Sequence, residues 1–133
     1  MSVLRLSIPA KPEYVVFTRL VLTGLSRATE IDEETLGDLK MAVTEVCSRS
    51  VRRAEAGEGL QIELCYELVD GTLTVAVEEE GAAFSPEALE QTPDTVSEDA
   101  MGLAIVQALV DELELVPLPD DRGSRLSFRK RLG

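Results

Sequence analysis

The chain has 133 residues, of which 44% are hydrophobic, and this composition suits one domain with an ordinary buried core. Its net charge of −12 argues against a general affinity for nucleic acid or for an anionic membrane surface. The sequence has no basic segment followed by a long apolar run and no uninterrupted apolar stretch of about 18 residues. We therefore expect a cytoplasmic protein that does not enter a membrane.

The residue inventory also limits the chemistry. The chain has no His, which excludes a His-dependent catalytic triad, and it has no CxxC pair for a structural zinc site. Its two cysteines, Cys47 and Cys65, both lie in apolar segments. Their setting favours two buried thiols over a disulfide or a metal site.

Charge is distributed unevenly along the chain. All 13 Lys and Arg residues lie in residues 1–53 and 122–133, whereas residues 54–121 hold 18 of the 25 acidic residues and no base. A solvated acidic surface accounts for this pattern, because Asp and Glu keep proteins soluble. A surface matched to a basic partner accounts for it equally well, because complementary charge steers association.

The first half of the chain predicts a strand and two helices. Leu4, Leu6 and Ile8 alternate with polar or exposed positions, as in a strand with one buried face, and two prolines then end it. A first helix is predicted over residues 13–28, because apolar residues recur there at intervals of three and four. The predicted buried face consists of Val16, Phe17, Leu20, Val21 and Leu25. A second helix is predicted from an N-cap at Asp32 to about Gly57.

The second half predicts a hairpin, a long loop, a helix and a second hairpin. "LQIELCYELV" and "TLTVAVEEE" alternate with a period of two on either side of Asp70-Gly71, which is a strong signal for a tight hairpin turn. Residues 80–97 contain prolines, small residues and acids, and loops of this length are usually functional or mobile. A third helix is expected over about 98–113, followed by strands at "LELVPL" and "SRLSFRKRL".

The order strand, two helices, two strands, long loop, helix, two strands predicts an α+β fold. We expect a two-layer sandwich in which a mixed sheet of about five strands carries three helices on one face. We also expect residues 1–133 to form a single domain.

Four short motifs lie on these elements in a particular order. They are "EVCSR" (45–49) on the second helix, "EEGAAF" (79–84) at a strand end, "AMGL" (100–103) where the third helix opens, and "RGSRLSFRKRL" (122–132) in the last hairpin. Over nearly the whole chain this arrangement resembles the GHKL or Bergerat-fold ATPases, specifically RsbW-type anti-sigma factors and serine-protein kinases. The resemblance implies a HATPase-like domain, with residues 85–99 acting as an ATP lid.

The resemblance also assigns roles to single residues. Glu45 aligns with the family's catalytic base, and Arg49 stands where the family has an Asn that ligates Mg²⁺. A guanidinium has donors only and stays protonated, so Arg49 cannot ligate a metal, and no metal ligand is predicted in this chain. Glu45 and Arg49 are spaced i, i+4 with the acid first, which favours an exposed ion pair on the helix surface over a catalytic base. Arg49 is also a candidate to fill the space where the metal would lie.

The residues that align with the family's adenine-binding motif depart from the family pattern as well. Glu79 aligns with the Asp that accepts a hydrogen bond from adenine, and Ala83 replaces a glycine where backbone must approach the nucleotide. Gly81, Gly102 and Gly123 keep glycine positions of the family, and close helix packing is the alternative role for Gly102. Phosphate sites use positively charged groups, whereas the lid region contains acidic residues that would repel a triphosphate. We therefore expect weak or absent ATP binding.

Two functions follow from the resemblance. The first is a binding module, an anti-sigma factor in stress response that sequesters an alternative sigma factor and is released by a STAS-domain antagonist, with no cofactor. Its candidate partner contacts are the acids at Glu87, Glu90, Asp94, Glu98 and Asp99, for which plain solvation is the alternative. The second is a serine-protein kinase that phosphorylates the antagonist with ATP and Mg²⁺, with Glu45 as base. A regulatory domain unrelated to sigma factors is a further alternative, and a homodimer joined through the sheet is implied in the first two.

Overall fold

A computed structural model describes residues 2–55, 61–80, 98–119 and 123–132 of the chain. The predicted order of elements is confirmed. The elements are β1 (Ser2–Pro9), the short 3-10 helix η1 (Pro12–Tyr14), α1 (Val15–Ala28), α2 (Glu33–Glu55), β2 (Gln61–Val69), β3 (Thr72–Glu80), α3 (Glu98–Leu109), β4 (Glu112–Pro117) and β5 (Gly123–Arg131).

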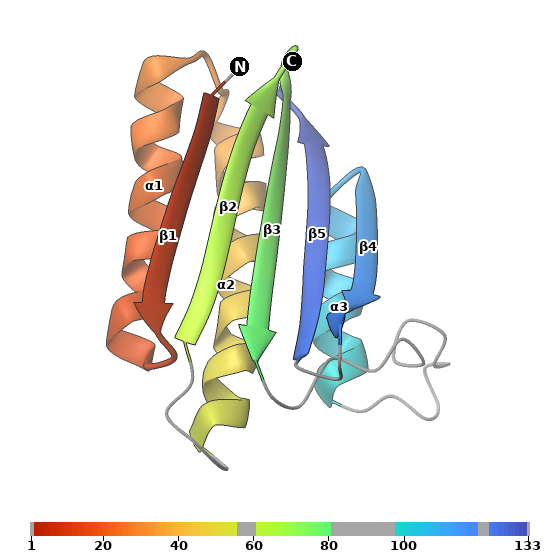
Figure 1. Ribbon diagram of the computed structural model, residues 1–133. Coiled ribbons are helices and arrows are strands. Elements are labelled where there is room, and N and C mark those ends of the chain that lie inside the picture. Colours follow the sequence, from red (N-terminus) through yellow and green to blue (C-terminus); the bar gives the residue numbers. More distant parts are fainter. Residues whose placement is uncertain (1, 56–60, 81–97, 120–122, 133) are drawn as a thin grey trace.

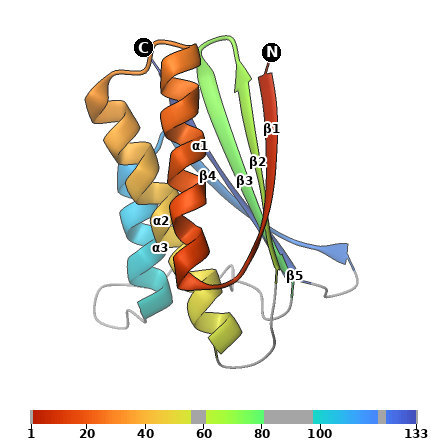
Figure 2. The same ribbon diagram turned by 90° about the vertical axis from the view of Figure 1, so that its left-hand side faces the viewer.

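The strands form one five-stranded sheet in the order β1-β2-β3-β5-β4, and α1, α2 and α3 cover one of its faces (Figure 1, Figure 2). The two-layer α+β prediction is therefore confirmed. All four pairings between these strands are antiparallel, so the expectation of a mixed sheet is wrong in that detail. Two helices between β1 and β2 reverse the chain direction, and β5 inserts between β3 and β4, which run the same way (Figure 1).

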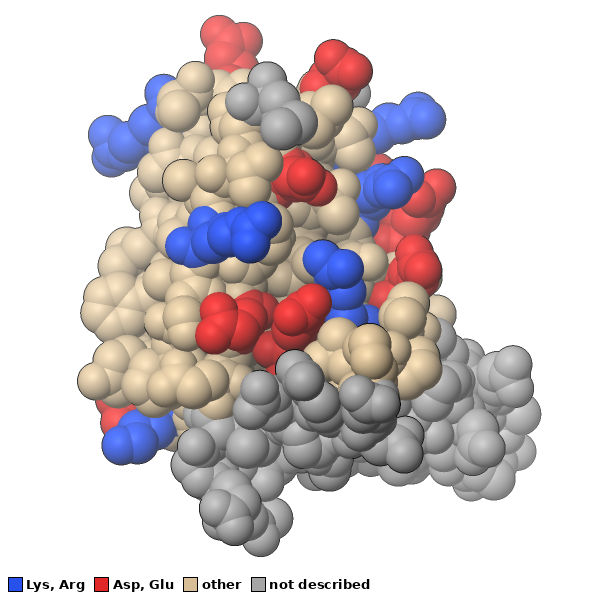
Figure 3. Space-filling model, viewed as in Figure 1, with Lys and Arg blue, Asp and Glu red and all other residues tan. Residues whose placement is uncertain are grey.

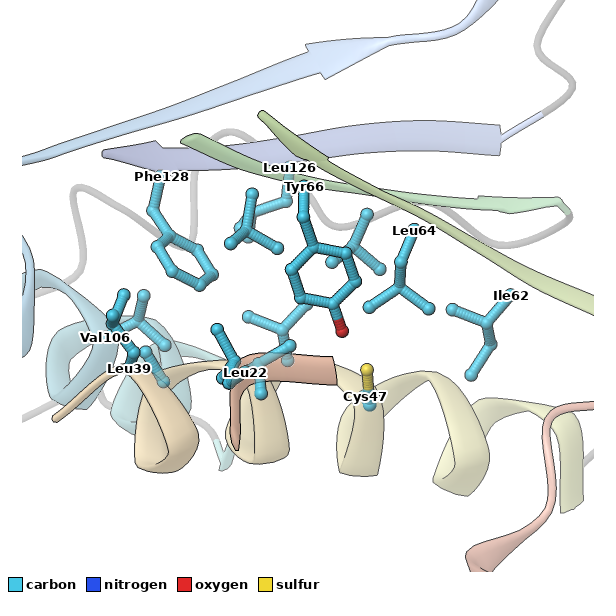
Figure 4. Close-up of a cluster of buried hydrophobic side chains, with 14 of the residues drawn as sticks. Leu22, Leu39, Cys47, Ile62, Leu64, Tyr66, Val106, Leu126 and Phe128 are labelled. Atoms are coloured by element: carbon cyan, nitrogen blue, oxygen red, sulfur yellow. The ribbon is translucent and has the colours of Figure 1, made fainter. Parts of the chain in front are cut away.

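The core lies between the sheet and α2. Strands β2, β3 and β5 turn alternate side chains toward the helices, and α2 and α3 supply the facing residues (Figure 4). The buried members drawn from these elements include Leu39, Val43, Val46, Ile62, Leu64, Tyr66, Leu73, Val75, Val77, Leu103, Val106, Leu126 and Phe128. One polar group crosses this layer: the buried Tyr66 hydroxyl donates a hydrogen bond of 2.8 Å to the backbone oxygen of Thr18 in α1.

Helix α1 buries a different face from the one predicted. Val15, Thr18, Leu22 and Leu25 are buried, whereas the predicted core positions Val16, Phe17 and Leu20 are 40%, 45% and 55% exposed. The apolar residues of this helix surround most of its circumference, so their spacing alone did not identify the face that meets the sheet. Thr18 tolerates burial because its hydroxyl donates to the Val15 carbonyl at 2.6 Å.

The ends of α2 and α3 are fixed by specific contacts. The predicted N-cap of α2 is confirmed, because the Asp32 Oδ1 accepts a 2.7 Å hydrogen bond from the Thr35 backbone N–H. Helix α3 ends at Leu109, four residues earlier than predicted. The Lys130 Nζ donates to the Leu109 carbonyl at 2.7 Å, and Leu113 is already part of β4. None of the described helices is long and apolar enough to cross a membrane.

Both cysteines are free thiols, as predicted, but only Cys47 is fully buried. Cys47 lies on α2, and its sulfur points toward the sheet (Figure 4). The Tyr66 hydroxyl points from the sheet into the same part of the core. Burial raises the pKa of the Cys47 thiol from 9.0 to about 12, and the nearby Glu79 carboxylate acts in the same direction. Cys65 is partly exposed on β2 and lies on the sheet face away from the helices.

This pKa shift predicts a specific loss of stability in alkali. The thiol's pKa is higher in the folded state than in the unfolded chain, so its contribution is complete below about pH 9 and is lost as pH rises toward about 12. Between pH 9 and pH 11 we expect the wild type to lose about 3 kcal/mol more than Cys47→Ala. Urea unfolding of both proteins at pH 8, 9, 10 and 11 measures the difference. A gap between them that stays constant with pH would contradict this assignment.

Candidate functional site

The candidate site lies at one edge of the molecule, where the ends of two helices and two strands meet. The carboxyl ends of α2 and β3 and the amino ends of α3 and β5 lie together at the lower edge of Figure 1. Of the sequence-predicted positions, Glu79 lies near the carboxyl end of β3 and Gly123 opens β5, whereas Gly102 lies in the second turn of α3 and Glu45 lies midway along α2. The fold thus places residues up to 78 positions apart in the sequence on elements that meet at this edge.

Helices α2 and α3 approach closely at Gly102. A Cβ added at Gly102 would lie 2.5 Å from the Glu45 Oε1 and 3.1 Å from the Arg49 Cδ. Glu45 and Arg49 lie one turn apart on α2, so both side chains reach the same point on α3. This contact fits the alternative role given above for Gly102, which is close helix packing. The absence of a side chain at Gly102 leaves room for the Glu45 and Arg49 side chains.

We predict different effects for two Gly→Ala substitutions in these helices. Gly102→Ala should be about 1–3 kcal/mol less stable than Gly37→Ala, because the new methyl group displaces the Glu45 carboxylate and crowds the buried Arg49. Gly37→Ala in α2 is the matched control: nothing lies within 4 Å of its added Cβ, so improved helix propensity should raise stability by about 0.5–1 kcal/mol. Thermal unfolding of both variants tests the pair. Equal shifts would contradict close packing at Gly102.

Arg49 is not on the surface. Its side chain is 1% exposed, whereas the side chain of Glu45 is 27% exposed and lies 3.9 Å from the guanidinium of exposed Arg52. The expectation of an exposed Glu45–Arg49 pair is therefore wrong about exposure. Along a helix of 3.6 residues per turn, Arg49 lies about 40° nearer the buried face than Glu45, and α3 covers that side.

Glu79 is buried as well, with 4% of its surface exposed. It lies near the end of β3, between Ile62 of β2 and Ser124 of β5, and Ser124 is 1% exposed. Its carboxylate is close enough to Cys47 to raise the pKa of that thiol. A carboxylate and a guanidinium are thus both withdrawn from solvent at this edge, an arrangement that is costly unless each is compensated.

The other predicted site residues are only partly described. Gly123 is buried, opens β5 and has φ of +146°, a conformation that favours glycine. Glu98 and Asp99 lie in the first turn of α3, and nothing more is described of them. The remaining predicted positions lie outside the described residues: Gly81, Ala83, Glu87, Glu90 and Asp94.

The described residues do not fit a magnesium ion at the position of Arg49. A buried guanidinium offers only donors and a fixed positive charge, so it would repel a cation rather than bind it. Within the described ranges, no three acidic or sulfur ligands gather in a way that could hold a metal ion. Sequence reasoning missed Arg52 as an ionic neighbour of Glu45 and missed buried Ser124 opposite Glu79. The spacing of 45 and 52, two helical turns, was the available signal for the first, whereas strand register alone reveals the second.

The fold and the placement of these motifs are those of a histidine kinase-like ATPase domain, and the family model of that description matches residues 8–130. The serine-protein kinase RsbW of Bacillus pumilus is 31% identical over 127 residues, which are 86% of this chain and 78% of that protein. The serine-protein kinase RsbW of Listeria innocua is 36% identical over 120 residues, covering 83% and 76%. The chain belongs to the RsbW family of histidine kinase-like ATPase domains.

A solved structure supports the fold. The crystal structure of the RsbU and RsbW domains of a Mycobacterium tuberculosis protein matches 99% of this chain with a TM-score of 0.70. The identity is 18%, so this likeness bears on the fold alone. The present chain corresponds to 33% of that longer chain.

Proposed function

We propose that this protein is an anti-sigma factor that binds and sequesters an alternative sigma factor and is released by a STAS-type antagonist. In this proposal residues 1–133 act as a single cytoplasmic binding domain, ATP binding is weak or lost, and nucleic acid is not a ligand. Membership of the RsbW family supports the class of protein. The acidic balance of the chain supports a basic protein partner rather than nucleic acid.

Burial of Arg49 is the main observation that supports a binding protein over an ATP-dependent kinase. In RsbW-type proteins that use ATP, the resemblance places a metal-ligating Asn at this position. Here a side chain that cannot ligate a metal is 1% exposed and packs against Gly102 at the start of α3. The position is thus occupied from within the protein by a fixed cation.

An active serine-protein kinase is the second candidate. The names of the two relatives favour it, and the Glu45 side chain is 27% exposed, so part of the carboxylate is accessible from solvent. Its ion pair with Arg52, at 3.9 Å between an exposed and a partly exposed group, is weak and would not hold the carboxylate in place. This candidate requires a metal-binding group other than Arg49.

Calorimetric titration with MgATP distinguishes the two functions. The binding module is expected to give no saturable heat at millimolar nucleotide, and Glu45→Ala should then sequester the sigma factor as well as the wild type. Micromolar MgATP binding, together with phosphate transfer to a STAS-domain protein that Glu45→Ala abolishes, would establish the kinase instead.

The acidic-surface proposal has its own test. Reversing Glu87, Glu90 and Asp94 to Lys should weaken binding of the sigma factor about tenfold or more and make the remaining affinity less sensitive to salt, because complementary charge steers the encounter. Reversing Glu30, Glu33 and Glu34, which lie in and before the first turn of α2, is the control of equal charge change. Binding measured at two salt concentrations gives the result. Equal losses from both triple variants would show that only net charge matters.

We also propose that the protein is a homodimer joined through the sheet. The helices leave the second face of the sheet uncovered by any described element (Figure 2), which supports this assembly. Light scattering at micromolar concentration tests it directly.

A further inference from the structure

Strand β4 forms one edge of the sheet. It pairs with β5 on one side only, and no described element lies beside its other side, which we call the free edge. Figure 1 shows this free edge at the right of the sheet. An edge strand leaves alternate backbone N–H and C=O groups without a sheet partner, and it can therefore accept another extended segment as a neighbour.

The ladder between β4 and β5 shows which backbone groups point outward. Just beyond β4, the Leu118 N–H donates a hydrogen bond of 2.9 Å to the Gly123 carbonyl. Hydrogen-bonded pairs recur every second residue in an antiparallel ladder, so the even-numbered residues of β4 turn their backbone groups toward β5. Leu113 and Leu115 therefore turn their N–H and C=O groups to the free edge. Pro117 shares this orientation, so its missing N–H costs the sheet no hydrogen bond.

On the helix side of β4, the hydrophobic core reaches the free edge without being fully covered. Leu113 and Leu115 stand opposite Phe128 and Leu126 of β5, which are 1% and 0% exposed. The two leucines pack against the same core but are only partly buried. Apolar side chains on a strand added outside β4 would cover them, and burial of apolar surface favours such an association.

On the sheet face away from the helices, β4 presents acids. Glu112 and Glu114 are exposed, and Figure 3 shows acidic groups along the right-hand edge of this face, where Figure 1 places β4. Glu112 pairs with Arg129 of β5 at 3.3 Å, whereas Glu114 stands opposite Ser127 and makes no ion pair within the described part of the chain. Glu114 and Ser127 also line a hollow of about 410 Å³. A long basic side chain on an added strand would therefore find both an opposite charge and space beside Glu114.

The acids disfavour β4 of a second copy as the added strand. If two β4 strands pair antiparallel with Leu113 opposite Leu115, Glu114 stands opposite Glu114 of the second copy, in a non-hydrogen-bonded pair where side chains lie closest. A shift by two residues one way brings Glu112 opposite Glu114. A shift the other way brings Pro117, which lacks an N–H, into the ladder.

Pairing of β4 with β1 of a second copy does not give a closed assembly. On the face that would meet the acids, β1 carries a single base, Arg5. The contact would join two different surfaces and leave a free β1 and a free β4 at the ends, so further copies would continue to add. Charge and closure therefore both favour a different protein as the occupant.

We propose that the free edge of β4 binds an extended segment of a basic partner protein, which adds antiparallel as a sixth strand. The partner residues opposite Leu113 and Leu115 are apolar and face the helix side, and those opposite Glu112 and Glu114 are Lys or Arg. Main-chain hydrogen bonds to the two leucines provide affinity, and the alternation of apolar and basic side chains provides specificity. Neither the sigma factor nor ATP takes part in this contact, which is additional to the proposed function.

A capped heptapeptide of alternating Val and Lys is the probe for this edge. We expect saturable binding to the wild-type chain at physiological salt, and at least tenfold weaker binding to Glu114→Lys. Glu30→Lys is the control of equal charge change, because Glu30 is exposed in the turn between α1 and α2, away from β4 (Figure 1), and its affinity should stay within about twofold of the wild type. Thermal unfolding confirms that both variants are folded. Equal losses from both would assign binding to net charge and overturn the proposal.

Backbone methylation of the peptide tests main-chain pairing apart from charge. In the added antiparallel strand, the Val residues turn their N–H groups toward β4 and the Lys residues turn theirs away. N-methylation of the Val nitrogens should therefore abolish binding, whereas N-methylation of the Lys nitrogens, at the same charge and composition, should preserve most of it. Equal affinity of the two methylated peptides, or the reverse order, would overturn the antiparallel pairing.

Amide hydrogen exchange locates the contact on the protein. The N–H groups of Leu113 and Leu115 should exchange rapidly in the chain alone, and the peptide should slow both at least tenfold. The N–H of Glu114, which already points to β5, should change much less. Slow exchange of both leucines before the peptide is added would show that the edge is already covered by this chain or by a second copy. That result, or protection at another surface instead, would overturn the proposal.

Discussion

Replacing Arg49 with Asn should raise the affinity for MgATP at least tenfold. The substitution removes a buried positive charge and supplies a carbonyl oxygen, the ligand type that a magnesium ion prefers, at the family's metal-ligating position. It also frees space beside Gly102, where the Arg49 side chain now lies. Calorimetric titration of wild type and variant with MgATP measures the change.

Arg52→Asn is the matched control for this experiment. Arg52 lies on the same helix and loses the same charge, but its side chain is 42% exposed and it reaches Glu45 only through a surface ion pair. We expect no gain in nucleotide affinity from it. If both variants gain equally, net charge governs binding, and if neither gains, Arg49 is not what keeps the nucleotide out.

Replacing Tyr66 with Ala should cost about 3–5 kcal/mol of stability, the largest loss that we predict for a single substitution. The ring is 1% exposed in the middle of the core, and its removal leaves a cavity between β2 and the helices. The lost hydroxyl also leaves the Thr18 carbonyl of α1 without this hydrogen bond, which is 2.8 Å long and buried. Urea unfolding measures the free energy.

Two further variants divide this loss into its parts. Tyr66→Phe keeps the ring and removes only the hydroxyl, so it should cost about 1–3 kcal/mol. Tyr14→Ala removes a tyrosine that is 37% exposed and contacts the ring of Phe17 at 6.0 Å between centroids, so its cost should stay within about 1 kcal/mol. A Tyr66→Phe cost as large as that of Tyr66→Ala would assign the whole effect to the hydrogen bond.

Strong local signals allowed most of the fold to be predicted from the sequence. The Asp70-Gly71 hairpin is present with both residues at positive φ, and the Asp32 cap begins α2 where expected. Predictions that depended on which side of an element meets the rest of the protein were less accurate. The buried face of α1 and the end of α3 at Leu109 both depended on contacts with distant segments.

The candidate site, too, was predicted only in part from the sequence. Motif order on the predicted elements assigned Glu45, Glu79 and Gly102 to one expected site. The structure brings Glu45 and Gly102 together and places Glu79 near Cys47 of α2, while their role as a nucleotide site stays a prediction. Sequence spacing could not show that Arg49 is buried, because an acid and a base spaced i, i+4 on a helix are usually both accessible to solvent. The packing of α3 over α2 decided that point.

The sequence by itself thus determined the element order, the α+β class, the motif positions and the uneven charge, because these depend on residue type and local spacing. Only the tertiary structure decided which charges are buried and which strands lie side by side. The sequence of a strand shows which of its residues alternate, but it does not show that β5 inserts between β3 and β4. Burial of Arg49 likewise requires a second helix to cover it, and no local pattern encodes that contact.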